Sequence, residues 1–334
     1  MNIAVLGAGA WGTAIAAVLS ARHSVVLYAR NPDQCAQLAR DRVNARYLPS
    51  LALSGSLHFT DDLHGAVKHT ASDGGLILVA TPTAALRSIV RDVSESAPNA
   101  PLVWLCKGLE QSTEQLPHQI VREEMGERAD AGPLSGPSFA IEVACGLPTA
   151  LTVAGAPDFC ERVTEALHAG ALRIYSTDDV VGVEVGGAVK NVMAIATGIS
   201  DALNLGLNAR AALITRGLAE MTRFGIALGA RAETFMGLTG IGDLILTATG
   251  DLSRNRKVGL ALGRGATMEA AVANLGHVAE GVRSAHAVLA RARQCHIDMP
   301  ITEAVCAVID GALTPSEALH ALLAREPKVE AQLS

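Results

Sequence analysis

The stretch Asn2-Ile3-Ala4-Val5-Leu6-Gly7-Ala8-Gly9-Ala10-Trp11-Gly12 decides how the first part of this chain folds. A short β-rich run enters a turn whose glycines follow the spacing Gly-x-Gly-x-x-Gly, and a helical pattern continues from Thr13 to Ser20. One glycine permits the turn, one lets a pyrophosphate approach the backbone, and one lets the helix pack closely. The amide groups at the helix start can bind phosphate. We therefore predict a strand, turn and helix that hold a dinucleotide; the alternative is a glycine-rich turn without a ligand.

A second β-rich run, residues 24–28, ends shortly before Arg30. At this place NAD-specific proteins carry an acidic residue that binds the ribose hydroxyls, and that acid is absent here. A guanidinium can instead pair with a 2′-phosphate at any cellular pH. We therefore expect NADP(H) as the preferred cofactor, with NAD(H) also possible; the alternative for Arg30 is a solvated arginine at a strand end.

Strands and helices continue to alternate beyond these two runs. Further β-rich runs lie at residues 75–80, 102–106, 149–153 and 172–175. The alternation predicts a Rossmann-like, doubly wound sheet in residues 1–178. Lys107 follows one of these strands, at the edge where open parallel sheets bind ligands, so it is a candidate site residue; the alternative is an ordinary loop lysine. Residues 134–140 follow another strand-like stretch and predict a tight turn that offers backbone amides and hydroxyls.

Residues 179–334 show no convincing strand pattern, and helical periods recur instead. The predicted helices span residues 181–199, 209–228, 254–262, 268–275, 281–292, 301–309 and 315–324. We therefore predict two domains: a dinucleotide-binding domain in residues 1–178 and an all-helical domain for substrate binding and catalysis in residues 179–334. The predicted fold class is α/β with an all-helical C-terminal domain.

Lys190 lies in the first of these helices, within the otherwise apolar run from Val185 to Ile195. Burial removes water from an ammonium group and lowers its pKa, so such a lysine can exchange a proton near neutral pH. Its neighbours on the same helix face, among them Gly187 and Ala194, are small and leave room beside it. Lys190 is therefore the candidate proton-transfer residue; the alternative is a snorkelling lysine whose stem covers apolar surface.

Asp243 follows a glycine-rich segment, residues 237–242, in the helical half. Such a carboxylate can be aimed at a ligand or a lysine, or it can cap a helix, and the local pattern leaves both interpretations open. Thr247 lies one turn later and can share the face of Asp243.

A second polar cluster begins at Ser253. Together with Arg254 and Asn255 it combines a helix-capping serine, a guanidinium and an amide at a helix start, which is how proteins bind a small phosphate. For Arg256 and Lys257, which follow directly, a solvated basic helix face is the simpler interpretation.

The composition excludes several classes of function. Apolar residues make up 49% of the 334, and the formal net charge of −6 gives no basic field for nucleic acid. The ten histidines show no metal-ligand spacing, so we expect no metal. The six cysteines contain no Cys-x-x-Cys pair, no signal peptide is evident, and no apolar run reaches the roughly 20 residues that span a bilayer. We therefore expect a soluble, cytoplasmic protein with reduced thiols.

Several stretches occur at the spacing of one known family. They are residues 7–12, 44–49, 106–110, 134–140, 182–191, 215–221, 237–244, 253–256 and 279–281. On these motifs the chain resembles the bacterial NAD(P)-dependent glycerol-3-phosphate dehydrogenases along essentially its whole length. The resemblance implies reversible reduction of dihydroxyacetone phosphate to sn-glycerol 3-phosphate with NADPH or NADH, which supplies glycerol phosphate for phospholipid synthesis.

The resemblance also implies roles for single residues. Lys190 would transfer the proton, Asp243 and Thr247 would tune it, and Lys107 would contact both cofactor and substrate. The residues implied to bind substrate are Lys107, Gly136, Ser138, Lys190, Asn191, Asp243, Ser253, Arg254 and Asn255. Those implied to bind the dinucleotide are Gly7, Gly9, Ala10, Trp11, Gly12, Arg30, Lys107, Ala140, Arg254, Val278 and Glu280. The chain departs from the family at Ala10, where serine is frequent, and at Ala202, where glycine is frequent.

Two other functions are weighed against this one. A β-hydroxyacid dehydrogenase of the 6-phosphogluconate type also sets a lysine on the first long helix after its Rossmann domain, but the Trp11-Gly12 pair and the cluster from Ser253 argue against it. A non-catalytic NADP(H)-binding regulator could keep the glycine motif and Arg30 but has no need of the two lysines, Asp243 and Arg254 together. Symmetry and base rate favour a homodimer through the helical domain.

Overall fold

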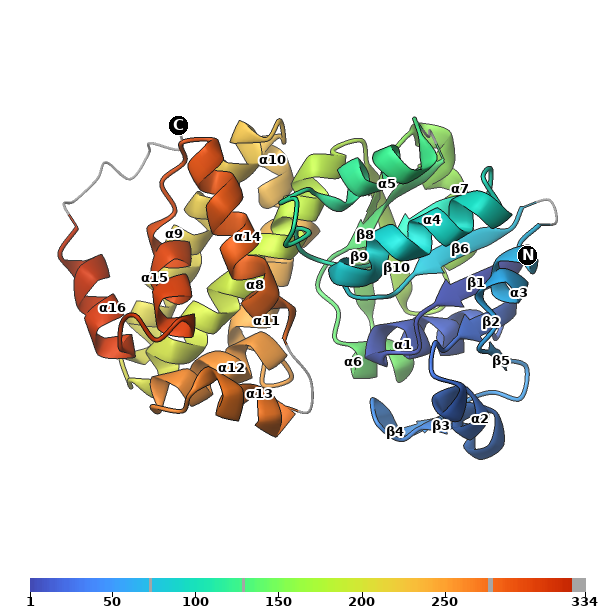
Figure 1. Cartoon of the computed structure of the whole chain (residues 1–334), viewed down its shortest axis with the longest axis horizontal. Helices are drawn as coiled ribbons and strands as arrows, with labels where there is room; N and C mark the ends of the chain where they lie inside the picture. Colours follow the sequence, from blue (N-terminus) through green and yellow to red (C-terminus); the bar gives the residue numbers. More distant parts are fainter. Residues whose placement is uncertain (72–73, 128–129, 276–278, 326–334) are drawn as a thin grey trace. The chain divides into compact units, whose positions relative to one another are not determined.

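The computed structural model describes residues 1–71, 74–127, 130–275 and 279–325 (Figure 1). It divides into two compact units. The first contains Met1–Cys106 and Pro117–Val180, and the second contains Lys107–Leu116 and the chain from Val181 onward. The first unit is α/β and the described part of the second contains helices and no strand, which confirms the predicted fold class. The segment 107–116, which the sequence analysis placed with the sheet, packs in the helical unit, where Leu109 and Leu116 join the core.

The first unit is built on a sheet with the strand order β10-β9-β8-β7-β6-β1-β2-β5. The strands are β1 (Asn2–Leu6), β2 (Ser24–Tyr28), β5 (His58–Thr60), β6 (Leu76–Val79), β7 (Leu102–Trp104), β8 (Ala131–Ser135), β9 (Thr149–Ala154) and β10 (Leu172–Thr177). All neighbours pair in parallel except β8 and β9. The chain order reverses at β1, which lies between β2 and β6. The carboxyl ends of β1, β2, β6, β7 and β8 therefore share one edge, and an open α/β sheet binds ligands at such a reversal.

Helices cover both faces of this sheet (Figure 1). They are α1 (Ala10–Leu19), α2 (Pro32–Asp41), α3 (Leu63–Lys68), η1 (Thr83–Ala85), α4 (Leu86–Ser96), α5 (Pro117–Met125), α6 (Ala140–Ala144) and α7 (Pro157–Leu167). Because side chains alternate along a strand, Ile3 and Val5 pack in the core with α1 and α7, whereas Ala4 and Leu6 pack with α4. Two-sided burial explains why the strands are continuously apolar.

Three short strands were not predicted from the sequence. Two of them, β3 (Val43–Asn44) and β4 (Leu48–Ala52), form a small antiparallel pair, and β5 extends the main sheet. A two-residue strand has no detectable periodicity, and Pro49 weakens the strand pattern of β4. The antiparallel direction of β9 was also not predicted, because a buried strand carries the same apolar pattern in either direction.

The second unit is organised around α8 (Val180–Ala202), in which every residue from Gly182 to Ser200 is buried. The other elements are α9 (Gly206–Ala227), α10 (Ala232–Phe235), η2 (Leu238–Gly242), α11 (Asp243–Thr249), α12 (Arg254–Gly263), α13 (Met268–Leu275), α14 (Glu280–Gln294), α15 (Pro300–Ile309) and α16 (Pro315–Leu323). Contrary to the sequence expectation, α8 is long and apolar enough to cross a membrane, the one such helix among the described residues. However, 83% of its apolar window is buried within the protein, as in the core helix of a globular domain.

Candidate functional site

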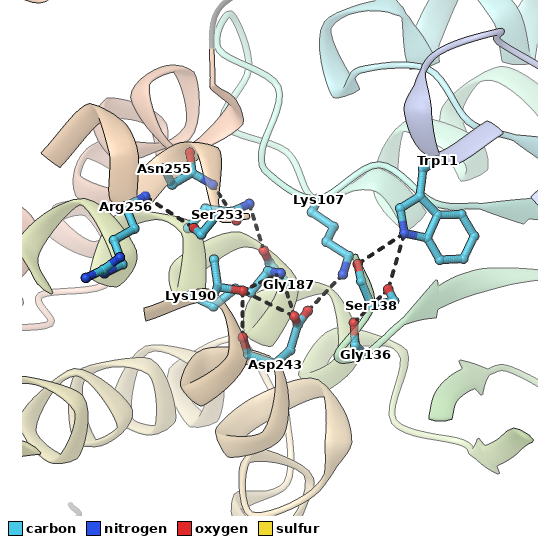
Figure 2. A network of polar contacts seen from close by, with 12 residues as sticks. Trp11, Lys107, Gly136, Ser138, Gly187, Lys190, Asp243, Ser253, Asn255 and Arg256 are labelled. Atoms are coloured by element: carbon cyan, nitrogen blue, oxygen red, sulfur yellow. Dashed lines mark hydrogen bonds and ion pairs between the residues drawn. The ribbon is translucent and has the colours of Figure 1, made fainter. Parts of the chain in front are cut away.

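Two lysines share one buried carboxylate in the second unit (Figure 2). The ammonium of Lys190 lies 2.6 Å from Asp243 Oδ1, and the ammonium of Lys107 lies 2.8 Å from Asp243 Oδ2. Lys190 also donates to Thr247 Oγ1 at 3.0 Å, and that hydroxyl donates to the Asp243 carbonyl oxygen at 2.6 Å. The structure thus brings together the four residues that the sequence analysis named as catalytic candidates, and Lys190 does not snorkel.

The local fold explains how Asp243 reaches the lysines. Asp243 is the first residue of α11, directly after the π-helical turn η2; its backbone N–H closes that turn, and its carboxylate accepts hydrogen bonds from the two lysines. The sequence left two roles open for the Asp243 side chain, and the structure shows pairing with lysine. A Cβ on Gly186 in α8 would collide with the Thr239 carbonyl in η2, so the glycine lets the two elements approach closely. Thr247 lies one turn after Asp243 on the same face, as predicted.

The electrostatics of this cluster set the protonation of Lys190. Burial lowers the pKa of Lys190 to about 8, against the raising effect of the Asp243 carboxylate, and the nearby Lys107 ammonium lowers it further. Burial raises the pKa of Asp243, but the two ammonium groups outweigh it and hold that pKa below its usual value. The cluster therefore contains a carboxylate that stays ionised and an ammonium that can give up its proton near pH 8.

Glu280 lies within electrostatic reach of the same lysines and of Arg254. Burial raises the pKa of Glu280, and the charges of Arg254, Lys107 and Lys190 oppose the rise. Arg254 is exposed as the first residue of α12, and Ser253 caps that helix by accepting the Arg256 N–H at 3.2 Å. The predicted capping serine is confirmed.

Asn191 and Asn255 form a chain of buried amides. Asn255 Nδ2 donates to Asn191 Oδ1 at 2.9 Å, Asn255 Oδ1 accepts the Gly281 N–H at 2.9 Å, and Asn191 Nδ2 donates to the Gly187 carbonyl at 3.2 Å. These bonds fix the orientation of the Asn255 amide and leave one hydrogen of its Nδ2 for another acceptor.

Arg256 is not the solvated residue that the simpler interpretation expected. It is only 9% exposed, and its Nε and Nη2 donate to Asp201 Oδ2 at 3.0 and 2.8 Å. Its Nη1 donates to Asp251 at 2.9 Å. Paired charges of this kind anchor α12 to the end of α8, whereas Lys257 is exposed as expected.

The glycine loop of the first unit has the geometry that its spacing predicts. Gly7 has φ +122°, and a Cβ there would lie 2.8 Å from the Ala80 carbonyl oxygen. A Cβ on Gly12 would collide with the Gly7 carbonyl, so α1 packs closely against the strand end. Beside Gly9 there is open space, which leaves the backbone accessible to a ligand. Ala10 follows as the first residue of α1.

Three further candidates lie together beside this loop (Figure 2). Trp11 Nε1 donates to Ser138 Oγ at 3.2 Å, and Ser138 Oγ donates to the Gly136 carbonyl at 3.2 Å. Ala140 begins α6 and packs with Trp11 in a small apolar cluster. Arg30 is exposed just after β2, and Val278 lies outside the described residues.

Residues that the sequence analysis missed support a ligand at this sheet edge. The hydroxyls of Thr81, Thr83 and Ser135 are buried and have no hydrogen-bond partner within the described chain. Thr81 and Ser135 lie at the carboxyl ends of β6 and β8, and Thr81 contacts the Gly7 turn. Buried polar atoms normally find partners, so these hydroxyls fit a polar ligand such as a dinucleotide. The sequence placed Thr81 and Thr83 shortly after the predicted strand at residues 75–80, but it did not indicate that their hydroxyls lack a partner. The described residues contain no cluster of His, Cys, Asp or Glu that could hold a metal.

Two family models match the chain. Residues 2–159 match "NAD-dependent glycerol-3-phosphate dehydrogenase N-terminus" and residues 179–320 match "NAD-dependent glycerol-3-phosphate dehydrogenase C-terminus". A glycerol-3-phosphate dehydrogenase [NAD(P)+] of Burkholderia orbicola is 58% identical over 332 residues, which cover 99% of this chain and 100% of the relative. One from Paucimonas lemoignei is 58% identical over 333 residues, covering 99% and 98%. The crystal structure of glycerol-3-phosphate dehydrogenase from Coxiella burnetii superposes with a TM-score of 0.92 at 40% identity, covering 97% of this chain and 98% of that one.

Proposed function

We propose that this chain, which belongs to the NAD-dependent glycerol-3-phosphate dehydrogenase family, reduces dihydroxyacetone phosphate to sn-glycerol 3-phosphate with NADPH or NADH. The reaction is reversible and would supply glycerol phosphate for phospholipid synthesis. The observation that carries the proposal is the buried cluster of Lys190, Asp243 and Lys107, which combines a proton donor near pH 8 with a fixed carboxylate.

Lys190 supplies the proton in this proposal. When bound, the nicotinamide cofactor supplies the hydride, and the ketone oxygen that becomes basic must receive a proton. The Lys190 ammonium delivers it, and in the reverse direction the neutral amine removes it from the alcohol. Asp243 keeps the ammonium form available despite burial, and Thr247 holds the amine in place at 3.0 Å.

The start of α12 would hold the substrate phosphate. Arg254 provides an exposed guanidinium, the N-terminus of α12 offers the positive end of the helix dipole to an anion, and Asn255 can still donate one hydrogen. Binding energy from the phosphate would then orient the carbonyl carbon for reaction. The glycine loop, the hydroxyls at the sheet edge and Arg30 would hold the dinucleotide, and Arg30 favours NADP(H).

The test follows NADPH absorbance with dihydroxyacetone phosphate, with a β-keto acid and with neither. We expect consumption only with dihydroxyacetone phosphate, and loss of turnover by orders of magnitude in Lys190→Ala with NADPH binding retained. Lys257→Ala, which removes an exposed lysine of the same unit, is the control and keeps wild-type turnover. Consumption with the β-keto acid would favour the 6-phosphogluconate type, and no consumption at all would favour a non-catalytic NADP(H)-binding protein.

We further propose a homodimer formed through the helical unit. A largely apolar groove of about 410 Å³ is lined by α8, α9, α15 and α16. The most exposed large apolar side chains of the described chain, Leu207 and Leu323 at 73% and 72%, lie on α9 and α16. Exposed apolar surface of this kind supports association with a second copy. Sedimentation of the wild type and of Leu207→Asp tests it: we expect a dimer and a monomer, respectively.

We propose a cytoplasmic location because the cysteines form no disulfides. All six cysteines are free, and four of them are buried. Proteins of oxidising compartments use such residues for disulfides, so free thiols support a reducing compartment. Cell fractionation tests this location.

A further inference from the structure

Two side-chain amides hold the peptide between Ala8 and Gly9 from one side. Gln34 Nε2, from α2, donates to the Ala8 carbonyl at 2.9 Å, and Asn44 Nδ2, from β3, donates to the same carbonyl at 3.1 Å. Asn44 is only 2% exposed, and its Nδ2 also donates to Thr13 Oγ1 in α1 at 2.7 Å. The carbonyl is thus tied to α2 and β3, and Asn44 is itself held by α1.

This clamp determines where the next amide points. In a trans peptide the carbonyl and the following N–H face opposite directions, and the described chain has no cis peptide. Fixing the Ala8 carbonyl toward Asn44 therefore turns the Gly9 N–H away from it. That N–H has no acceptor among the residues that the structure describes, and no atom beyond the adjacent residues lies within 4 Å of the place of a Gly9 Cβ. A free donor beside open space is suited to a phosphate oxygen.

We propose that Asn44, assisted by Gln34, is a positioning residue that orients the Ala8–Gly9 peptide so that the Gly9 N–H binds the cofactor pyrophosphate. The inference rests on the proposed function, because it requires a bound dinucleotide. It gives a role to the Asn44-Ala45-Arg46-Tyr47-Leu48-Pro49 motif, which the proposed chemistry leaves unused. A donor that is already oriented needs no reorganisation when the ligand arrives, so the clamp strengthens binding without touching the ligand.

The test measures dissociation constants by calorimetry for two ligands, NADPH and 2′-AMP. The second ligand has the adenosine and the 2′-phosphate but no pyrophosphate. Asn44→Leu and Gln34→Met each remove one hydrogen bond to the Ala8 carbonyl at similar side-chain volume. We expect each to weaken NADPH binding about fivefold and the double variant about 25-fold, with the affinity for 2′-AMP within twofold of wild type. The value of kcat at saturating NADPH should stay close to wild type, because the clamp does not contact the reacting atoms.

Thr70→Val is the matched control. Thr70 is 3% exposed in the same unit and donates a buried hydrogen bond to the Val67 carbonyl, away from the loop. Thr70→Val should lose about as much stability as the Asn44 and Gln34 variants, but it should leave NADPH binding unchanged. Unchanged NADPH binding in the double variant, or equal weakening of NADPH and 2′-AMP, overturns the inference. Gln34→Met keeps the test decisive if Asn44→Leu folds poorly, because Gln34 is only partly buried. If the wild type binds NADPH but reduces no substrate, the proposed function is wrong, whereas the role inferred for Asn44 and Gln34 in NADPH binding still holds.

Discussion

Asp243→Asn removes one charge from the buried cluster at almost constant shape, and it should shift the pKa of Lys190 downward. The wild-type pKa of Lys190 is about 8, with the Asp243 carboxylate 2.6 Å away opposing the effect of burial. Two unit charges about 4 Å apart attract by about 4 kcal/mol at an effective dielectric constant near 20. One pKa unit corresponds to about 1.4 kcal/mol, so loss of the carboxylate should lower the pKa by roughly 2 to 3 units.

The assay is the pH dependence of kcat/KM in both directions. Ketone reduction needs the ammonium, so its rate falls as the pH rises through the pKa of Lys190, near 8 in the wild type. Alcohol oxidation needs the neutral amine, and its rate rises through the same pKa. In Asp243→Asn both limbs should move to lower pH by the same amount, because one group controls both.

The matched control is Asp201→Asn. Asp201 is a partly buried acid on the same helix as Lys190, but it pairs with Arg256 and Arg210 and makes no bond to the lysine. Its loss should reduce stability and leave both pH limbs in place. Limbs that stay near pH 8 in Asp243→Asn, or that move upward, would refute the assignment of the titrating group to Lys190.

Three further predictions concern other parts of the chain. Burial raises the pKa of Glu220 to about 7, although its carboxylate accepts backbone N–H groups at the start of α15, so the folded state loses stability as the pH rises from 4.5 to 7. Between pH 5 and pH 8, Glu220→Gln should therefore gain about 2.5 kcal/mol of stability relative to wild type, measured by urea unfolding followed by circular dichroism. A Cβ on Gly198 would collide with the Arg256 carbonyl, so Gly198→Ala should lower stability by about 1–3 kcal/mol in thermal unfolding, whereas Gly55→Ala, with open space around it, should not. Arg30→Glu should raise the KM for NADPH at least tenfold and lower the preference over NADH; an unchanged ratio of kcat/KM for the two cofactors would contradict the 2′-phosphate role.

The sequence predicted the parts of the fold that depend on local pattern. Apolar, β-rich runs identified β1, β2, β6, β7, β9 and β10, and the three glycines of the loop occupy the geometries that their spacing implies. It also identified α8 and its lysine, because a charge in a long apolar run stands out locally. The features that it missed are short, such as β3, or have no local pattern, such as the direction of β9.

The candidate site was predictable as a set of residues but not as an arrangement. The local pattern around Asp243 left helix capping and lysine pairing equally open, because the partner lies 53 residues away in the chain. Arg256 looked like a surface residue for the same reason, since its partner Asp201 lies 55 residues away on another helix. Only the packing of α8 against α11 and α12 decides these pairs. The buried hydroxyls of Thr81 and Thr83 show a further limit, because nothing in the sequence says which hydroxyl lacks a partner.

If the substrate phosphate binds at Arg254 as proposed, its charge should act on the proton donor through the charges of the second unit. Lys107, Lys190 and Arg254 carry three positive charges and Asp243 and Glu280 two negative ones, so the group formally retains one positive charge. A phosphate bound at Arg254, whose charge acts on Glu280, would add negative charge to this group and should raise the pKa of Lys190 above about 8, which keeps the donor protonated in the complex. The pH profile of kcat reports the enzyme–substrate complex, and that of kcat/KM reports the free enzyme. The pKa obtained from kcat should therefore be higher than the pKa obtained from kcat/KM. Arg254→Gln should bring the two limbs together, and a separation that persists in this variant would show that the phosphate does not act on Lys190 through Arg254.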